Sequence, residues 1–234
     1  MVNNLVHIVM PVKDSIETAE RAIRAILDSG HTLTVYDDYS TPENAGRLDG
    51  LAQEWGFKVV HVRDHFHHQS PNYRWVLIES QYTALEKKVP LVIVESDVIV
   101  REHTIDRLLE AVTSDEIGMV AAITVDENGA INFPYEYARR RKEDGVCKKR
   151  MSFCCTLLSQ AFLQAYDFVQ LLPQKDWYDV SISHTAKRMG FKSILQVTNP
   201  VLHMPHSSRP WKQLKKTRPI LYYIRKILQH RDRI

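Results

Sequence analysis

The chain has 234 residues, of which 44% are hydrophobic and 25% are charged, with eight glycines and ten prolines. This length and balance suit one α/β domain with a full core or two small ones, and they exclude a fibrous or low-complexity protein. We find no apolar window long enough to cross a membrane, and residues 1–12 lack the basic start and long apolar run of a signal peptide. Three cysteines, two of them adjacent, make a poor disulfide framework and lack the spacing of a zinc site, so we expect a cytoplasmic protein.

Charge is distributed unevenly along the chain. The formal net charge is +3, but residues 211–234 hold eight Lys/Arg and one acid, a charge of +7 that leaves −4 for residues 1–210. A mildly acidic body argues against a protein that binds nucleic acid, because such proteins present basic surfaces to phosphates. We therefore expect one domain at residues 1–210, followed by a separate basic segment at 211–234.

Short apolar strands alternate with amphipathic helices along the first half of the chain. Strands are predicted at 5–12, 33–36, 58–62 and 91–94, and helices at 15–29, 45–55, 73–88 and 104–112. The second half is less regular, with strands expected at 118–125, 152–158 and 191–197 and helices at 160–168 and 176–189. The alternation indicates βαβ units, so we predict an α/β fold with a single Rossmann-like domain, in which helices flank a mixed, mainly parallel sheet.

Acidic residues follow two of the predicted strands. The triplet Glu95-Ser96-Asp97 interrupts the apolar segment 91–101. The pair Asp37-Asp38 directly follows the predicted strand at 33–36. Since a buried charge is costly, we expect these acids at the carboxyl ends of parallel strands, which meet at one edge of a sheet. Two carboxylates one residue apart can hold a hard divalent cation, with diphosphate oxygens completing its shell. A surface turn explains either cluster alone, but it explains the pair less well.

Five short motifs in this order resemble those of family 2 glycosyltransferases of the GT-A fold, over roughly residues 5–208. They are P-V-K-D at 11–14 (family P-x-Y-N), V-Y-D-D-Y-S-T at 35–41 (family V-D-D-G-S-T), E-S-D at 95–97 (family D-x-D), D-V-S-I-S-H-T-A-K-R-M-G-F at 179–191 (family E-D-x-x-L-x-x-R-x-x-x-G-[WFY]), and V-L-H-M at 201–204, where the family carries a histidine. Departures at Lys13, Tyr39, Glu95 and Tyr178 mark a divergent member.

The resemblance implies a site for a nucleotide and a metal. The nucleotide-binding residues would be Pro11, Val12, Asp14, Asp37, Asp38 and Glu95, the last of them near the ribose or the metal. Asp97 would ligate Mn²⁺ or Mg²⁺, and His203 would be an additional ligand. Helix capping is the alternative role for Asp37 and Asp38, and a histidine satisfied by the protein at the end of a strand is the alternative for His203.

The same resemblance places a general base at the start of the helix near residue 178. Asp179 is the first candidate, and Asp176 is the runner-up three residues earlier. An acid at this position also stabilises a helix simply through the helix dipole, so the structural role stays open. A base here would permit a single in-line displacement that inverts the anomeric centre.

We therefore predict a metal-dependent, inverting glycosyltransferase of the hexosyltransferase type, with a UDP-linked donor and a saccharide or lipid-linked acceptor. One alternative is a sugar nucleotidyltransferase, but residues 11–16 lack the glycine-rich loop that would hold a triphosphate. A second alternative is a non-catalytic protein that binds nucleotide sugars with the same fold.

Residues 211–234 mix basic and apolar side chains. Leu221, Ile224 and Leu228 share one face of a helix, whereas Arg225 and Arg231 point elsewhere. This segment is expected to form an amphipathic helix that contacts the inner face of an anionic membrane or a second copy of the chain. A solvated tail, or a helix packed on the domain, remains an equal alternative.

Overall fold

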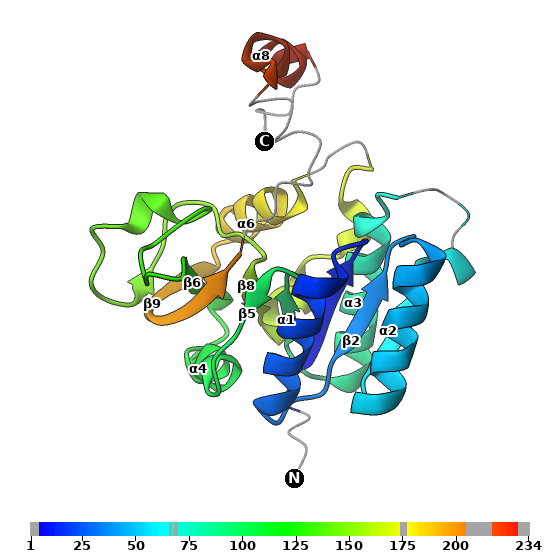
Figure 1. Cartoon of the computed structure of the whole chain (residues 1–234). Coiled ribbons are helices and arrows are strands. Elements are labelled where there is room, and N and C mark those ends of the chain that lie inside the picture. The colour runs from blue at the N-terminus through cyan, green and yellow to red at the C-terminus, as the bar shows by residue number, and fades with distance from the viewer. Residues whose placement is uncertain (1–4, 66, 68–69, 174–176, 205–216, 229–234) are drawn as a thin grey trace.

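A computed structural model describes residues 5–65, 67, 70–173, 177–204 and 217–228 (Figure 1). The strands are β1 (His7–Val12), β2 (Thr34–Asp37), β3 (Lys58–His61), β4 (Leu91–Val94), β5 (Val98–Ile99), β6 (Ile117–Val125), β7 (Gly145–Val146), β8 (Cys155–Leu158) and β9 (Lys192–His203). The α-helices are α1 (Ile16–Asp28), α2 (Pro42–Trp55), α3 (Tyr73–Lys87), α4 (Thr104–Glu110), α5 (Gln160–Ala165), α6 (Tyr178–Arg188) and α8 (Pro219–Leu228). Short 3₁₀ turns lie at Val62–Asp64, Glu136–Ala138 and Phe168–Gln170.

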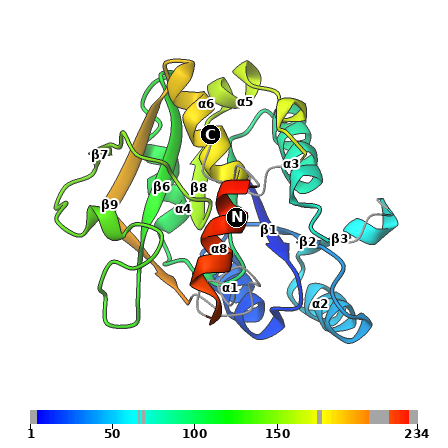
Figure 2. The same ribbon diagram turned by 90° about the horizontal axis from the view of Figure 1, so that it is seen from above.

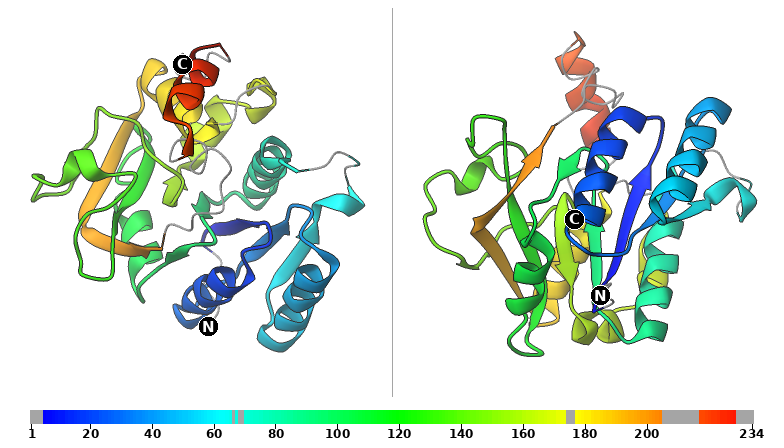
Figure 3. Two further views of the ribbon diagram at one scale, coloured as in Figure 1. Left: turned by 45° about the horizontal axis from the view of Figure 1, so that its top comes forward. Right: turned by 60° about the horizontal axis from the view of Figure 1, so that its bottom comes forward.

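The nine strands described here form one sheet in the order β3-β2-β1-β4-β8-β6-β9-β5, and β7 pairs with β9 off this path. The strands β3, β2, β1 and β4 are parallel, which is why nearly every residue of β1, β2 and β4 is buried. Strand β8 runs antiparallel to both neighbours, β4 and β6, and β6 is parallel to β9. Both views of Figure 3 show β6 and β9 side by side.

Helices cover both faces of the sheet. One core cluster joins β1 to α1, α2 and α4 through side chains such as Met10, Ile23 and Leu48. A second cluster joins the other face to α3, α5 and α6, with Leu77, Phe162 and similar side chains. Figure 2 shows this layering, with α3, α5 and α6 on one side of the strands and α1 and α2 on the other. Because β1, β2 and β4 are parallel, their carboxyl ends lie at one edge of the sheet.

The predicted α/β class and the mixed, mainly parallel sheet are confirmed, and β4 has the predicted limits. The clearest difference is β9, which continues to His203 past its predicted end at 197. Asn199-Pro200 favours a break in a strand, but a register shift opposite Ala122 and Ile123 accommodates the proline. The two-residue strands β5 and β7 were not predicted, because they are too short to carry a periodic signal.

Part of the basic segment is helical, as predicted. Helix α8 covers Pro219–Leu228, whereas 211–216 and 229–234 lie outside the described residues. Ile220, Tyr223 and Ile224 are 76%, 51% and 48% exposed, so these three residues are not buried against the described domain, whereas Leu221 and Tyr222 are partly buried. Among the described helices, none is long and apolar enough to cross a membrane.

One close backbone approach generates a stability prediction. A Cβ added at Gly118 on β6 would lie 2.8 Å from the Cβ of Phe191, so Gly118→Ala should lower the free energy of unfolding by about 1–3 kcal/mol through overpacking. Gly50→Ala on α2 is the matched control, because nothing lies within 4 Å of its added Cβ. That variant should gain about 0.5–1 kcal/mol from helix propensity. Urea unfolding measures both, and equal stability of the two variants would contradict the packing described here.

Candidate functional site

The acidic triplet forms a tight turn between β4 and β5. The Glu95 N–H donates to the carbonyl of Cys154 at 3.0 Å, and the Val98 N–H donates to the Glu95 carbonyl at 3.0 Å. Asp97 is only 4% exposed, although it carries a carboxylate. The turn therefore is a connection between two strands, and it also holds two carboxylates at the carboxyl end of a parallel strand. The geometry is therefore compatible with both interpretations of the triplet, a turn between strands and a site for a cation.

His203 reaches the triplet from the far end of β9. Its Cα is paired with that of Val98 on β5, and the Met204 N–H donates to the Asp97 carbonyl at 2.9 Å. The ring Nδ1 lies 2.6 Å from the Phe133 carbonyl oxygen, and Nε2 lies 3.5 Å from Asp97 Oδ2. A carbonyl oxygen only accepts, so Nδ1 carries a proton and the neutral ring keeps its lone pair on Nε2. Histidines that bind metals are commonly oriented in this way.

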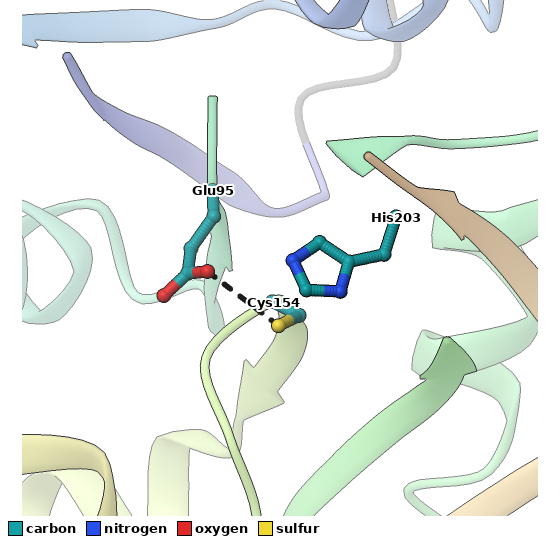
Figure 4. Close-up of side chains that lie close together, drawn as sticks. All are labelled: Glu95, Cys154 and His203. Carbon is teal, nitrogen blue, oxygen red and sulfur yellow. Dashed lines mark hydrogen bonds between the residues drawn. The ribbon is translucent and has the colours of Figure 1, made fainter. Parts of the chain in front are cut away.

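Three donor atoms from Glu95, Cys154 and His203 lie within 4.8 Å of one another (Figure 4). Figure 4 shows a ring nitrogen of His203 facing Glu95, and the Cys154 Sγ is 3.5 Å from Glu95 Oε2. Cys154 was not expected in the site, because its distance along the sequence from Glu95 and His203 matches no known metal-binding motif. It arrives there because β8 runs antiparallel to β4, with Cys155 paired to Val94.

Asp179 lies in the first turn of α6, where its Oδ1 accepts the Val180 N–H at 2.8 Å. Burial and, second to it, the negative charge of Glu95 together raise the pKa of this carboxyl to about 6. The Val180 N–H, a hydrogen bond to Ser152 and the charge of Arg150 act in the opposite direction. The charge of Glu95 acts on Asp179, so α6 brings this carboxyl to the same region as the acidic triplet. The alternative base, Asp176, lies outside the described residues.

Asp37 ends β2 and is fully buried. Its Oδ1 accepts the Ser40 N–H at 3.0 Å, and its Oδ2 lies 2.8 Å from Nδ1 of His61. Partial burial lowers the pKa of His61, but the hydrogen bonds that its ring donates to Asp37 and Asp49 outweigh this effect and hold the pKa above its ordinary value. Asp37 therefore fixes the turn after β2. It does not cap α2, because the Thr41 hydroxyl does so by accepting the Asn44 N–H.

Asp38 is 7% exposed and connects the turn after β2 to the start of α3. Its Oδ2 accepts the Ser70 hydroxyl at 2.7 Å and the Asn72 N–H at 2.9 Å, and its Oδ1 accepts the Asn72 side-chain amide at 2.7 Å. Tyr39 follows in a left-handed conformation, with φ of +62°, at the position where the resembling motif has glycine. The backbone of that motif is therefore kept although its glycine is not.

The end of β1 holds Pro11, Val12 and Asp14, which lie beside the turn that follows β2. The Asp38 N–H donates to the Val12 carbonyl at 2.8 Å, and Asp14 Oδ1 accepts the Thr41 N–H at 2.7 Å. Pro11 is partly buried, Val12 is buried and Asp14 is exposed. The expected nucleotide residues thus lie at the ends of β1 and β2, except Glu95, which follows β4 beside the expected metal ligands. The expected metal residues gather at the ends of β4 and β9, on the same edge of the sheet as β1 and β2.

The sequence matches no protein-family model, and no curated protein is similar to it. Many solved structures are similar in fold, and three of them are described here. The crystal structure of GalNAc-T7 with UDP, GalNAc and Mn²⁺ has a TM-score of 0.60 at 14% identity, over 88% of this chain and 44% of that one. The crystal structure of S. aureus TarS 1–349 has a TM-score of 0.61 at 12% identity, over 94% of this chain and 65% of that one. A mycobacterial protein has a TM-score of 0.57 at 18% identity, over 87% and 68%.

The chain thus spans less than two thirds of the length of the first two structures. Together these similarities confirm the GT-A-type fold that the sequence motifs imply. At such identities they establish the fold alone, and membership of family 2 stays a prediction.

Proposed function

We propose that the chain is a metal-dependent, inverting glycosyltransferase that moves a sugar from a nucleotide-diphosphate sugar, UDP-linked in our reading, to an acceptor hydroxyl. The observation that carries this proposal is the convergence of Glu95, Asp97, His203 and Asp179 beside the end of β4 in a GT-A fold. Such a cluster offers a cation site and, close by, a carboxyl with a raised pKa, which is what the reaction requires.

The residues fit a divalent cation. Carboxylate oxygens suit Mn²⁺ and Mg²⁺, and His203 presents the lone pair of Nε2 because Phe133 holds its other ring nitrogen. Glu95, Asp97 and His203 would hold the ion, which would supply Lewis-acid stabilisation of the charge on the leaving diphosphate. The GalNAc-T7 structure, which contains UDP and Mn²⁺, supports the choice of cation and of donor class.

The turns after β1 and β2 form the proposed nucleotide side of the site. The Asp37 carboxylate accepts a hydrogen bond from His61, and the Asp38 carboxylate accepts hydrogen bonds from Ser70 and Asn72. We therefore assign both aspartates mainly to holding the shape of these turns. Pro11, Val12 and the exposed Asp14 then border the position proposed for the nucleobase. The carboxylate of Asp14 is exposed to solvent and can accept a base N–H.

Asp179 is the proposed general base. Its carboxylate takes the proton of the acceptor hydroxyl, the acceptor oxygen bonds to the anomeric carbon, and the bond from that carbon to the diphosphate oxygen breaks. This single displacement inverts the anomeric centre. A pKa near 6 keeps the group ionised at neutral pH while making it a better base than an exposed aspartate.

The acceptor is proposed to be a saccharide or a lipid-linked saccharide, with the protein on the cytoplasmic side of a membrane. Cys147, Cys154 and Cys155 are all free thiols, which suits a reducing compartment. The basic segment supports a peripheral contact with anionic lipid, since α8 exposes Ile220 and Ile224 within a segment whose charge is +7.

Replacing Asp97 tests the metal assignment. Asp97→Ala should weaken Mn²⁺-dependent UDP binding at least about tenfold, because it removes a proposed ligand from a buried turn. Titration calorimetry of UDP with and without Mn²⁺ measures the effect. Asp28→Ala is the control, because Asp28 is an exposed acid in a surface ion pair with Arg24. Unchanged affinity in Asp97→Ala would remove this residue from the site.

Replacing Asp179 tests the base. Asp179→Asn keeps the shape of the side chain but cannot take a proton, so donor binding should persist and transfer should fall about a hundredfold or more. The wild-type kcat/KM should rise with pH through a limb at about pH 6 or lower, because the base must be ionised and a bound cation would only lower its pKa. If Asp179→Asn transfers normally and Asp176→Asn does not, the role belongs to Asp176.

Liposome flotation tests the basic segment. The full chain should float with anionic vesicles and release them as salt rises, because each Lys or Arg near the surface contributes on the order of 1 kcal/mol. A variant that ends at Pro210, and neutral vesicles, are the controls. Equal recovery of both chains with anionic vesicles would refute the membrane contact, and light scattering on the same two chains would then show whether the segment forms a dimer.

A further inference from the structure

Cys154 is the one member of the donor cluster that the proposed reaction does not use. We infer that its thiol makes this position a site for a thiophilic ion, in which Zn²⁺ is bound by Glu95, Cys154 and His203. The inference rests on the proposed function for its choice of site, but it goes beyond the Mn²⁺ or Mg²⁺ that the transfer reaction would use.

The geometry suits a tetrahedral ion. Zinc bonds of roughly 2.0–2.3 Å separate two tetrahedral ligands by about 3.6 Å. The distance from Glu95 Oε2 to Cys154 Sγ is 3.5 Å, so this pair already stands at that separation. The His203 donor lies within 4.8 Å of both, so a movement of about 1 Å completes the triangle.

The three donors are also held by the fold. Cys154 is 1% exposed, its carbonyl accepts the Glu95 N–H at 3.0 Å, and its Sγ lies 3.6 Å from the Ser152 hydroxyl. His203 is 3% exposed, and Phe133 fixes its ring so that Nε2 faces the cluster. Preformed ligands lose little conformational freedom on binding, which favours a tight site.

The donor types select the ion. Thiolate is a soft ligand that favours Zn²⁺ over the hard ions Mn²⁺ and Mg²⁺, whereas imidazole and carboxylate accept either class. One Cys, one His and one Glu leave a fourth position for water or a diphosphate oxygen, as in zinc sites with three protein ligands. The thiol proton leaves to solvent as the Zn–S bond forms. Zn²⁺ bound here uses His203 and Glu95, so it must displace Mn²⁺ rather than bind beside it.

The neighbouring cysteine supplies a matched comparison. Cys155 is fully buried on β8, and burial alone raises its pKa to about 12. Its Sγ makes no hydrogen bond to any residue within the described part of the chain. Replacing Cys155 by serine therefore changes the adjacent cysteine without touching the cluster.

The test uses Co²⁺ as a spectroscopic probe for Zn²⁺ in the full chain, with no nucleotide and no sugar. One equivalent of Co²⁺ should produce thiolate-to-metal charge-transfer absorption, and one equivalent of Zn²⁺ should abolish it. Cys154→Ser should lose the absorption and bind Zn²⁺ at least about tenfold more weakly, while Cys155→Ser keeps both. Circular dichroism checks that each variant is folded.

A second measurement separates this inference from the proposed function. Mn²⁺ binding, followed by electron paramagnetic resonance, should change less than about twofold in Cys154→Ser, because Mn²⁺ depends on the oxygen and nitrogen donors. Charge-transfer absorption that persists in Cys154→Ser, or that never forms in the wild type, overturns the inference. An equal loss of Mn²⁺ and Zn²⁺ also overturns it, since the thiol would then support the whole site rather than select an ion. Failure of sugar transfer would leave these results unaffected.

Discussion

The antiparallel pairing of β5 with the end of β9 is the contact on which the site depends. It sets Val98 opposite His203 and lets Met204 donate to the Asp97 carbonyl, so that two segments far apart in the sequence meet at the carboxyl end of β4. Without this pairing, the acidic triplet would be an ordinary turn. With it, a buried imidazole stands beside a buried carboxylate, 3.5 Å apart.

The second constraint is electrostatic. The negative charge of Glu95 opposes ionisation of the Asp179 carboxyl, and the burial of that carboxyl acts in the same direction. The raised pKa of Asp179 is the visible result. A divalent cation bound at the acidic triplet would offset this repulsion. Glu95, a proposed metal ligand, acts on the pKa of Asp179, the proposed base, so the two proposed roles are coupled.

Much of the fold could be predicted because its first half consists of regular βαβ units. The strands ending at Val12, Asp37 and Val94 have continuous apolar runs, and parallel packing buries them on both faces. Prediction failed where local sequence and tertiary packing disagree. Asn199-Pro200 looks like a break, yet β9 passes through it by means of a register shift.

The candidate site was foreseen in part, for the same reason. Acids that follow apolar strands are visible in a sequence, so Asp97 and Asp37 stood out. Cys154 did not, because its place beside Glu95 depends on β8 pairing antiparallel to β4, which no local pattern encodes. The structural roles of Asp38 were likewise hidden, since its partners Ser70 and Asn72 belong to a different loop.

The most direct measurement for the proposed function is incubation of the wild-type chain with a panel of nucleotide sugars in the presence and absence of Mn²⁺. The account predicts slow, Mn²⁺-dependent release of a nucleoside diphosphate from one donor, faster when the right acceptor is present. Release of pyrophosphate from nucleoside triphosphate and sugar phosphate would instead identify a nucleotidyltransferase. Binding of a nucleotide sugar without turnover, with any acceptor, would contradict the central claim that this site transfers sugar.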